Sequence, residues 1–172
     1  MKAQVMVPIF LAAASVAVAP MPVAGASAPR CTTAHLSAHL GQAGGAAGSV
    51  YQPIVWTNKS HSACTLFGYP GVSYVAPSSG KQVGAAATHN TQHPPKTVTL
   101  QPGGHASALV QMADYQNYPK AKCHPTAVSG LRVYPPGSHS AEFVKFATQR
   151  KACSTRVHQL SVEATVKGKA GQ

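Results

Sequence analysis

The chain has 172 residues, of which 44% are hydrophobic and only 10% are charged, and its 14 lysines and arginines stand against 3 acidic residues, for a formal net charge of +11. This composition is too apolar for a disordered chain, and the length excludes a multidomain enzyme. The scarcity of carboxylates also disfavours most hydrolytic and metal-dependent chemistry. A small, strongly basic domain is therefore expected.

Residues 1–26 have the pattern of a secretory signal peptide. Lys2 supplies the positive start, residues 5–19 form an apolar run, and small residues follow, with cleavage expected after Ala26. No later segment approaches the roughly 18 consecutive apolar residues of a membrane span. We therefore expect a secreted protein, extracellular or cell-wall associated, without a transmembrane anchor.

Short apolar runs with a period of two alternate with turn residues along the rest of the chain, which is typical of sandwich or barrel strands. The strands expected in chain order are residues 34–40, 50–57, 63–67, 72–76, a short one near 85–88, 98–100, 105–112, 131–134, 142–146 and 157–166. Between them we expect a flexible break over 41–48, a tight turn at 68–71 with positive φ at Gly71, and an irregular connection over 114–125.

About eight or nine substantial strands come close to the seven to nine of an immunoglobulin-like sandwich. The predicted fold is an all-β, immunoglobulin-like antiparallel β-sandwich with two disulfides over residues 27–166, followed by a disordered basic tail over 167–172.

The cysteines are Cys31, Cys64, Cys123 and Cys153. In an exported chain four cysteines fit two disulfides with three alternative pairings, and no Cys-x-x-Cys motif suggests redox chemistry. Sequential pairing would close two loops of similar length, each stabilising the fold by about 3 to 4 kcal/mol. Arg30 stands where a lipobox requires a small residue, so Cys31 is expected to remain free to pair.

A series of motifs in fixed order resembles the actinobacterial secreted domain of unknown function 4232. The residues that carry the resemblance are Cys31, Leu36, Leu40-Gly41, 45–51, Trp56-Thr57-Asn58-Lys59-Ser60, Cys64-Thr65-Leu66, 68–72, 95–100, Pro102-Gly103-Gly104 and 130–137. The resemblance implies an exported or lipid-anchored β-sandwich from a Gram-positive cell envelope, with the disulfides Cys31–Cys64 and Cys123–Cys153. It implies no activity.

Catalytic groups are few. Asp114, Glu142 and Glu163 are the only side-chain carboxylates, and the strand pattern predicts that Glu142 and Glu163 lie on solvated faces. A glycosidase would need two carboxylates at a defined separation, and no Gly-x-Ser-x-Gly turn marks a serine hydrolase. We expect no enzymatic activity and no cofactor.

Nine histidines make metal binding an alternative function. His35 and His39 would lie roughly 13 Å apart along a strand, too far to share one ion. His89 and His93 occupy a loop, and they are the weak candidates for a zinc or copper site. Acidification through about pH 6.5 would add positive charge to the histidines and strengthen any anion affinity.

Short basic clusters are the leading candidate for a binding surface, comprising Lys120, Lys122, Arg150, Lys151 and Arg156. The leading hypothesis is a monomeric, non-enzymatic binding domain that engages anionic cell-wall polymers or other extracellular polyanions. No recognised motif supports sequence-specific nucleic-acid binding. Another alternative is a secreted protease inhibitor that presents Lys120 or Lys122 on an exposed loop over 115–122.

Overall fold

The computed structural model describes residues 27–169, so the expected signal peptide and the last three residues of the expected tail lie outside the described residues. The strands within this part are β1 (Leu36–Leu40), β2 (Gly44–Ala46), β3 (Ser49–Asn58), β4 (Cys64–Leu66), β5 (Gly71–Val75), β6 (Gln82–Val83), β7 (Thr88–His89), β8 (Val98–Leu100), β9 (His105–Ala113), β10 (Pro125–Tyr134), β11 (Glu142–Cys153), β12 (Leu160–Val162) and β13 (Val166–Lys167). The helical turns are η1 (Thr33–His35), η2 (Tyr115–Asn117) and α1 (Lys120–Cys123).

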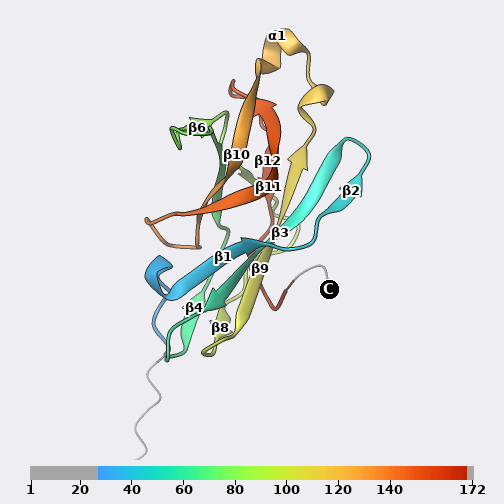
Figure 1. The fold of residues 1–172 in the computed structure, drawn as a ribbon. Helices are drawn as coiled ribbons and strands as arrows, with labels where there is room; N and C mark the ends of the chain where they lie inside the picture. Colours follow the sequence, from blue (N-terminus) through green and yellow to red (C-terminus); the bar gives the residue numbers. More distant parts are fainter. Residues whose placement is uncertain (1–26, 170–172) are drawn as a thin grey trace, which may run out of the picture.

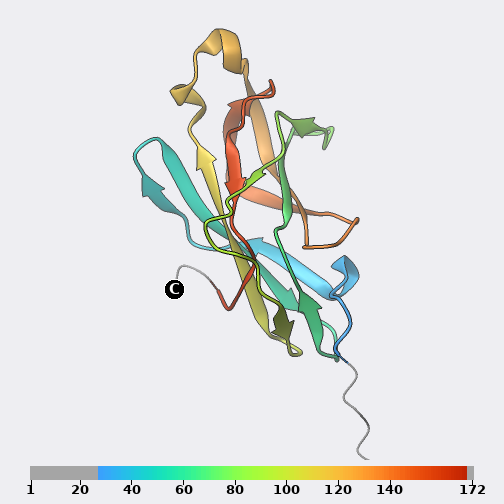
Figure 2. The ribbon, with the colours of Figure 1, turned by 180° about the vertical axis from the view of Figure 1, so that it is seen from behind.

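These strands form three sheets. The largest has the order β1-β3-β9-β12-β7, with β2 added to β3 and β13 added to β9. The second has the order β11-β10-β5-β6, and β4 pairs with β8 in the third. All named pairs are antiparallel except β12 with β7. Figures 1 and 2 show the two larger sheets against each other, with α1 at one end and β4 and β8 at the other, which confirms the predicted β-sandwich.

Alternation along β3 and β9 places matched side chains in the core. Trp56 and Ile54 of β3 are fully buried, and their neighbours in register on β9 are Ala106 and Ala108. The small alanines leave room for the two large side chains, so large and small residues alternate across this face of the sheet. On the other sheet Leu131 is fully buried in the same core.

Pro53 lies inside β3 although that strand is paired on both edges. A proline lacks the N–H that a sheet ladder needs. On the side that Pro53 faces, the neighbouring strand changes from β1, which ends opposite Ile54, to β2, which begins opposite Tyr51. Gly41 donates its N–H to the Pro53 carbonyl at 2.8 Å, so the proline stands at the break between two strands and removes no ladder bond.

Several elements differ in extent from the sequence prediction. Residues 33–35 form the turn η1, so β1 begins two residues later than expected, and residues 44–46 form β2 instead of a flexible break. The strand expected over 157–166 is divided into β12 and β13. Lys167, predicted to begin a disordered tail, pairs with Ala106 of β9. The strands β2 and β13 pair with their neighbours through backbone hydrogen bonds, so the alternation of apolar and polar side chains does not predict them.

The strands β10 and β11 are the largest extension beyond the expected 131–134 and 142–146. Their register runs from Val133 opposite Glu142 to Pro125 opposite Cys153, with an irregularity between Val128 and Gly130. The far ends are joined by the Cys123–Cys153 disulfide, whose Cα atoms are 4.4 Å apart. This covalent link joins the two strands at the end of their register and limits how far these ends can separate.

The expected tight turn at residues 68–71 is wrong. Gly71 is the first residue of β5, and the positive φ belongs to Gly68, at 108°. The Gly68 carbonyl accepts a hydrogen bond from the Thr165 N–H at 3.0 Å. The segment is therefore a link that carries the chain from β4 to a different sheet, and glycine is suited to the left-handed conformation it needs.

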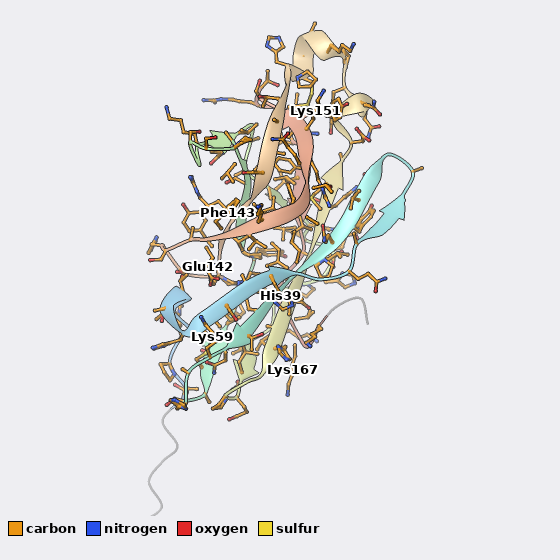
Figure 3. All side chains as sticks on the ribbon, in the orientation of Figure 1. His39, Lys59, Glu142, Phe143, Lys151 and Lys167 are labelled. Atoms are coloured by element: carbon orange, nitrogen blue, oxygen red, sulfur yellow. A yellow bond between two sulfur atoms is a disulfide. The ribbon has the colours of Figure 1, made fainter. Side chains whose placement is uncertain are left out.

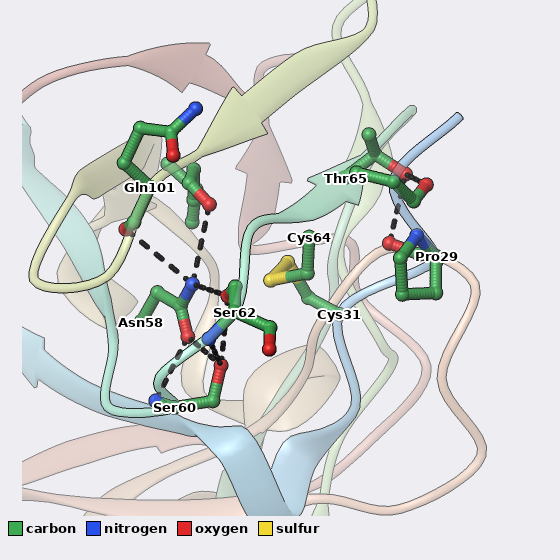
Figure 4. Close-up of a disulfide and its surroundings, with 10 residues drawn as sticks. Pro29, Cys31, Asn58, Ser60, Ser62, Cys64, Thr65 and Gln101 are labelled. Atoms are coloured by element: carbon green, nitrogen blue, oxygen red, sulfur yellow. Dashed lines mark hydrogen bonds between the residues drawn. A yellow bond between two sulfur atoms is a disulfide. The ribbon is translucent and has the colours of Figure 1, made fainter. Parts of the chain in front are cut away.

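The Cys31–Cys64 disulfide confirms the pairing that the resemblance implies. Its Cα atoms are 4.9 Å apart, and both cysteines are buried. Next to it Thr65 accepts a backbone hydrogen bond from Cys31 at 2.9 Å and donates one to Pro29 at 2.8 Å. Figure 4 shows this junction, which fastens the start of the described chain to β4.

Candidate functional site

The connection over residues 114–125 is held in a fixed shape at one end of the sandwich. Asp114 accepts a hydrogen bond from the Gln116 N–H at 2.9 Å and so caps η2. The turn α1 ends at His124, which has a positive φ of 47°. Cys123 then joins this turn to the end of β11.

The loop that follows β11 is fastened to α1 by several hydrogen bonds. The Ser154 N–H donates to the Cys123 carbonyl at 3.0 Å, and the Ser154 hydroxyl donates to the His124 carbonyl at 2.9 Å. The Thr155 hydroxyl donates to the Lys122 carbonyl at 2.6 Å. Two segments about thirty residues apart in sequence therefore form one rigid unit.

This unit gathers four of the five cations predicted to bind anions. Lys120 and Lys122 are on α1, Lys151 lies two residues before Cys153, and Arg156 follows it, and all four are exposed. We call these four residues the basic end. Figure 3 places Lys151 in the same half of the molecule as α1 in Figure 1. The imidazole of His124 and that of His158 are also exposed on these segments.

Arg150, the fifth predicted cation, has a different environment. Its guanidinium lies 4.4 Å from the centre of the Phe146 ring, and it donates to Gln52 Oε1 at 3.3 Å and to Met112 Sδ at 3.5 Å. The half-buried side chain thus joins β11 to β3 and β9. No local pattern indicates this role, because its partners come from other strands. We leave Arg150 out of the basic end.

Tyr74 lies beside this arginine and is buried. Its ring meets the Phe146 ring edge-on, with the centroids 6.2 Å apart. Burial raises the pKa of the Tyr74 hydroxyl well above its ordinary value, and the charge of Arg150 lowers it only in part. The phenol is therefore neutral over the physiological range, and this aromatic group stabilises the core.

The three carboxylates lie apart from one another. Asp114, Glu142 and Glu163 line three different hollows of the surface. The prediction of a solvated face for Glu142 is wrong, because Glu142 is half-buried and its Oε2 accepts the Ala38 N–H at 2.9 Å. Its Oε1 is buried and has no hydrogen-bond partner within residues 27–169. Glu142 closes the edge between β1 and β11. A mechanism with paired carboxylates would need two of them in one cavity, and each of these three lines a different one.

The histidines predicted as weak metal candidates both meet Tyr69. The imidazole of His89 stacks on the Tyr69 ring at 4.4 Å with an angle of 9° between the planes. The Tyr69 hydroxyl donates to the His93 carbonyl at 3.3 Å. Across residues 27–169 no group of three or more His, Cys, Asp or Glu is arranged to hold a metal ion. Metal binding through His89 and His93 stays a prediction.

The segment predicted as a protease-inhibitor loop is folded into turns. Lys120 and Lys122 belong to the helical turn α1, and η2 occupies residues 115–117, so neither lysine is in an extended stretch of chain. In the part of the chain that is described, none of the helices has the length and hydrophobicity required to cross a membrane.

Comparison with known proteins gives one finding. A family model described as "Domain of unknown function (DUF4232)" matches residues 31–166. Neither a curated protein nor a solved structure matches the chain. The matched range begins at the first cysteine and ends at the first residue of β13.

Proposed function

The chain belongs to the DUF4232 family, and from this premise we propose that it is an exported, non-enzymatic domain. In this proposal its basic end binds anionic polymers of the cell envelope or the extracellular space. Two disulfides support export, because such bonds form in oxidising compartments. The signal-like pattern of residues 1–26 agrees with this compartment.

The observation that carries the proposal is the arrangement of the basic end. Its four cations are exposed on two segments that a disulfide and several hydrogen bonds hold together. Fixed, solvated charges of one sign produce a positive potential that attracts a polyanion and releases its counterions. Asp114, the nearest acid in sequence to α1, already caps η2.

Acid should strengthen this binding. His124 and His158 lie on the same two segments as the four cations. Histidine is the side-chain type whose charge most commonly changes between pH 5 and pH 8. Salt should weaken the binding, because screening shortens the range of exposed charges to about 10 Å at 0.1 M.

The test measures retention of the oxidised protein on purified anionic cell-wall polymer, at low and high salt and at pH 5.5 and 7.5. In the test variant Lys120, Lys122, Lys151 and Arg156 are all replaced by Gln. The matched control replaces Arg30, Lys59, Lys145 and Lys169 by Gln, which removes the same number of exposed charges of the same kinds.

We expect the test variant to lose at least about tenfold in affinity at low salt and to show a salt slope lower by about one for each contact removed. The control variant should change much less. Equal losses in both variants would show that total charge, not the basic end, drives binding. Failure of the unaltered protein to bind at low salt and pH 5.5 would refute the proposal.

A further inference from the structure

A cavity in the other half of the molecule has the size of a small-molecule site. It has a volume of about 740 Å³ and is lined by residues 93–94, 96–99 and 163–167. Ligand pockets of proteins usually measure about 300 to 1,000 Å³. Figure 3 places Lys167, which lines this cavity, far from Lys151 of the basic end. The two sites are therefore separate.

The walls of the cavity come from different sheets and are fixed independently of any ligand. One wall includes β8, whose partner is β4, and the other leads into β13, whose partner is β9. The Thr165 N–H donates to the Gly68 carbonyl at 3.0 Å, and the Glu163 N–H donates to the Leu109 carbonyl at 3.0 Å. A preformed cavity of this kind loses little conformational entropy when it binds a ligand.

The residues that line the cavity include apolar side chains that are largely buried and charged side chains that are exposed. Val98 and Ala164 are buried, and Lys96 and Lys167 are exposed lining residues. Glu163, which is half-buried, is the carboxylate among the lining residues, so the cations are in excess. This pattern favours a ligand with an apolar body and an anionic group.

Thr165 supplies a second, independent observation. The residue is 1% exposed and lines the cavity, yet its Oγ1 is buried and has no hydrogen-bond partner among the described residues. A buried hydroxyl without a partner destabilises the fold, so such groups are uncommon in folded proteins. A polar group of a ligand would satisfy this hydroxyl only by reaching an atom that is buried in the free protein.

We propose that this cavity binds a small amphipathic anion, a molecule with a hydrocarbon body and a single carboxylate or phosphate. The body contacts Val98 and Ala164, and the anionic group is attracted by Lys96 and Lys167. The Thr165 hydroxyl would donate to an oxygen of that group once its side chain turns toward the ligand. This site is independent of the polymer-binding proposal, since it shares no residue with the basic end.

Decanoate is the probe, titrated into the oxidised protein below its micellar concentration and followed by calorimetry and by backbone amide shifts. We expect saturable binding of one decanoate, with the largest shifts in residues 93–99 and 163–167. Decyltrimethylammonium, which has the same chain and the opposite charge, should bind at least about tenfold more weakly, because each exposed cation near the head group contributes a factor of a few.

Three variants separate the proposed contacts from general effects. The double change Lys96→Gln and Lys167→Gln should weaken decanoate binding roughly tenfold, whereas Lys59→Gln with Lys145→Gln should leave it unchanged. Glu163→Gln should tighten binding, because a repulsive carboxylate is removed. Thr165→Val should keep the native amide spectrum, since the hydroxyl makes no hydrogen bond to any described residue, and should weaken binding.

Absence of saturable decanoate binding would overturn the proposal. Equal binding of decanoate and decyltrimethylammonium would also overturn it, as would a Lys96→Gln, Lys167→Gln variant that binds like the control. Saturable binding of an acidic extended peptide without binding of decanoate would assign the cavity to a peptide and would likewise reject the small-anion proposal.

Discussion

Replacing Asn58 by aspartate is a sharp test of how the sandwich is closed at the end opposite α1. Asn58 is 1% exposed. Its Nδ2 donates to the carbonyls of Ser62 at 2.9 Å and Leu100 at 3.2 Å, and its Oδ1 accepts the Ser60 N–H at 3.0 Å and the Ser60 hydroxyl at 2.7 Å (Figure 4). This one side chain joins the turn after β3 to the turn between β8 and β9.

The substitution Asn58→Asp keeps the side-chain size and the acceptor Oδ1 but replaces the donor by an acceptor. The carbonyls of Ser62, Leu100 and Gln101 lose a donor, and a carboxylate oxygen comes to lie against them. A hydrogen bond contributes about 1 kcal/mol, and each buried group left unsatisfied costs about 1 to 3 kcal/mol. We expect a loss of roughly 3 to 5 kcal/mol in the free energy of unfolding, a large part of the roughly 5 to 15 kcal/mol typical of a domain.

The assay is guanidinium-induced unfolding of the oxidised protein, with and without N58D, at pH 7 and pH 4. Burial and the facing carbonyls raise the pKa of the introduced carboxyl in the folded state above its unfolded value of about 3.9. Its destabilising effect is therefore present at pH 7 and is lost as the pH falls through the folded pKa. The difference between the two proteins should narrow at pH 4.

The matched control is Asn58→Ala, which removes the same hydrogen bonds without adding a titratable group. Its loss of stability should be similar at both pH values when compared with the unaltered protein. The reasoning would be refuted if N58D lay within about 0.5 kcal/mol of the unaltered protein at pH 7, which is the usual range for a neutral surface change. A gap for N58D that stays constant between pH 7 and pH 4 would refute it equally.

Three further predictions concern stability measured by the same unfolding assay. Gly130→Ala should destabilise by several kcal/mol, because a Cβ there would collide with the Val144 carbonyl oxygen of β11, whereas Gly45→Ala, with nothing within 4 Å, should change stability by less than about 1 kcal/mol. Arg150→Lys should cost about 1 kcal/mol, since an ammonium cannot reproduce the planar stacking and the forked donors; full stability in this variant would contradict the packing role. Replacing Cys123 and Cys153 together by Ser should cost about 3 to 4 kcal/mol and weaken polymer retention, and unchanged retention would show that the disulfide does not organise the basic end.

Sequence patterns predicted the strands whose apolar side chains pack in the core. The apolar residues over 50–57 predicted a buried strand, and Ile54, Val55 and Trp56 in it are all buried. The strand β2 could not be predicted, because residues 44–46 are Gly-Gly-Ala and pair through backbone groups alone. The second half of β11 escaped prediction because it is mostly polar, so no hydrophobic period marks it as a strand.

The candidate sites divide in the same way. The lysine pair of α1 is evident from neighbouring residues in the sequence, but its proximity to Arg156 requires the disulfide to bring two distant segments together. The interior position of Arg150 depends on Phe146, Gln52 and Met112, which no local pattern connects. The walls of the 740 Å³ cavity are residues 93–94, 96–99 and 163–167, which are far apart in the sequence, so only the folded chain could reveal the cavity.

The Cys31–Cys64 junction has a mechanical consequence. The start of the described chain is fixed to β4, and α1 with the basic end lies at the opposite end of the molecule (Figure 1). A force applied between these two ends enters through a covalent bond and passes along the length of β3 and β9, whose register extends from Ser49 opposite Ala113 to Thr57 opposite His105. Such a load shears many backbone hydrogen bonds at once instead of opening them one by one, so the sandwich transmits tension along its long axis.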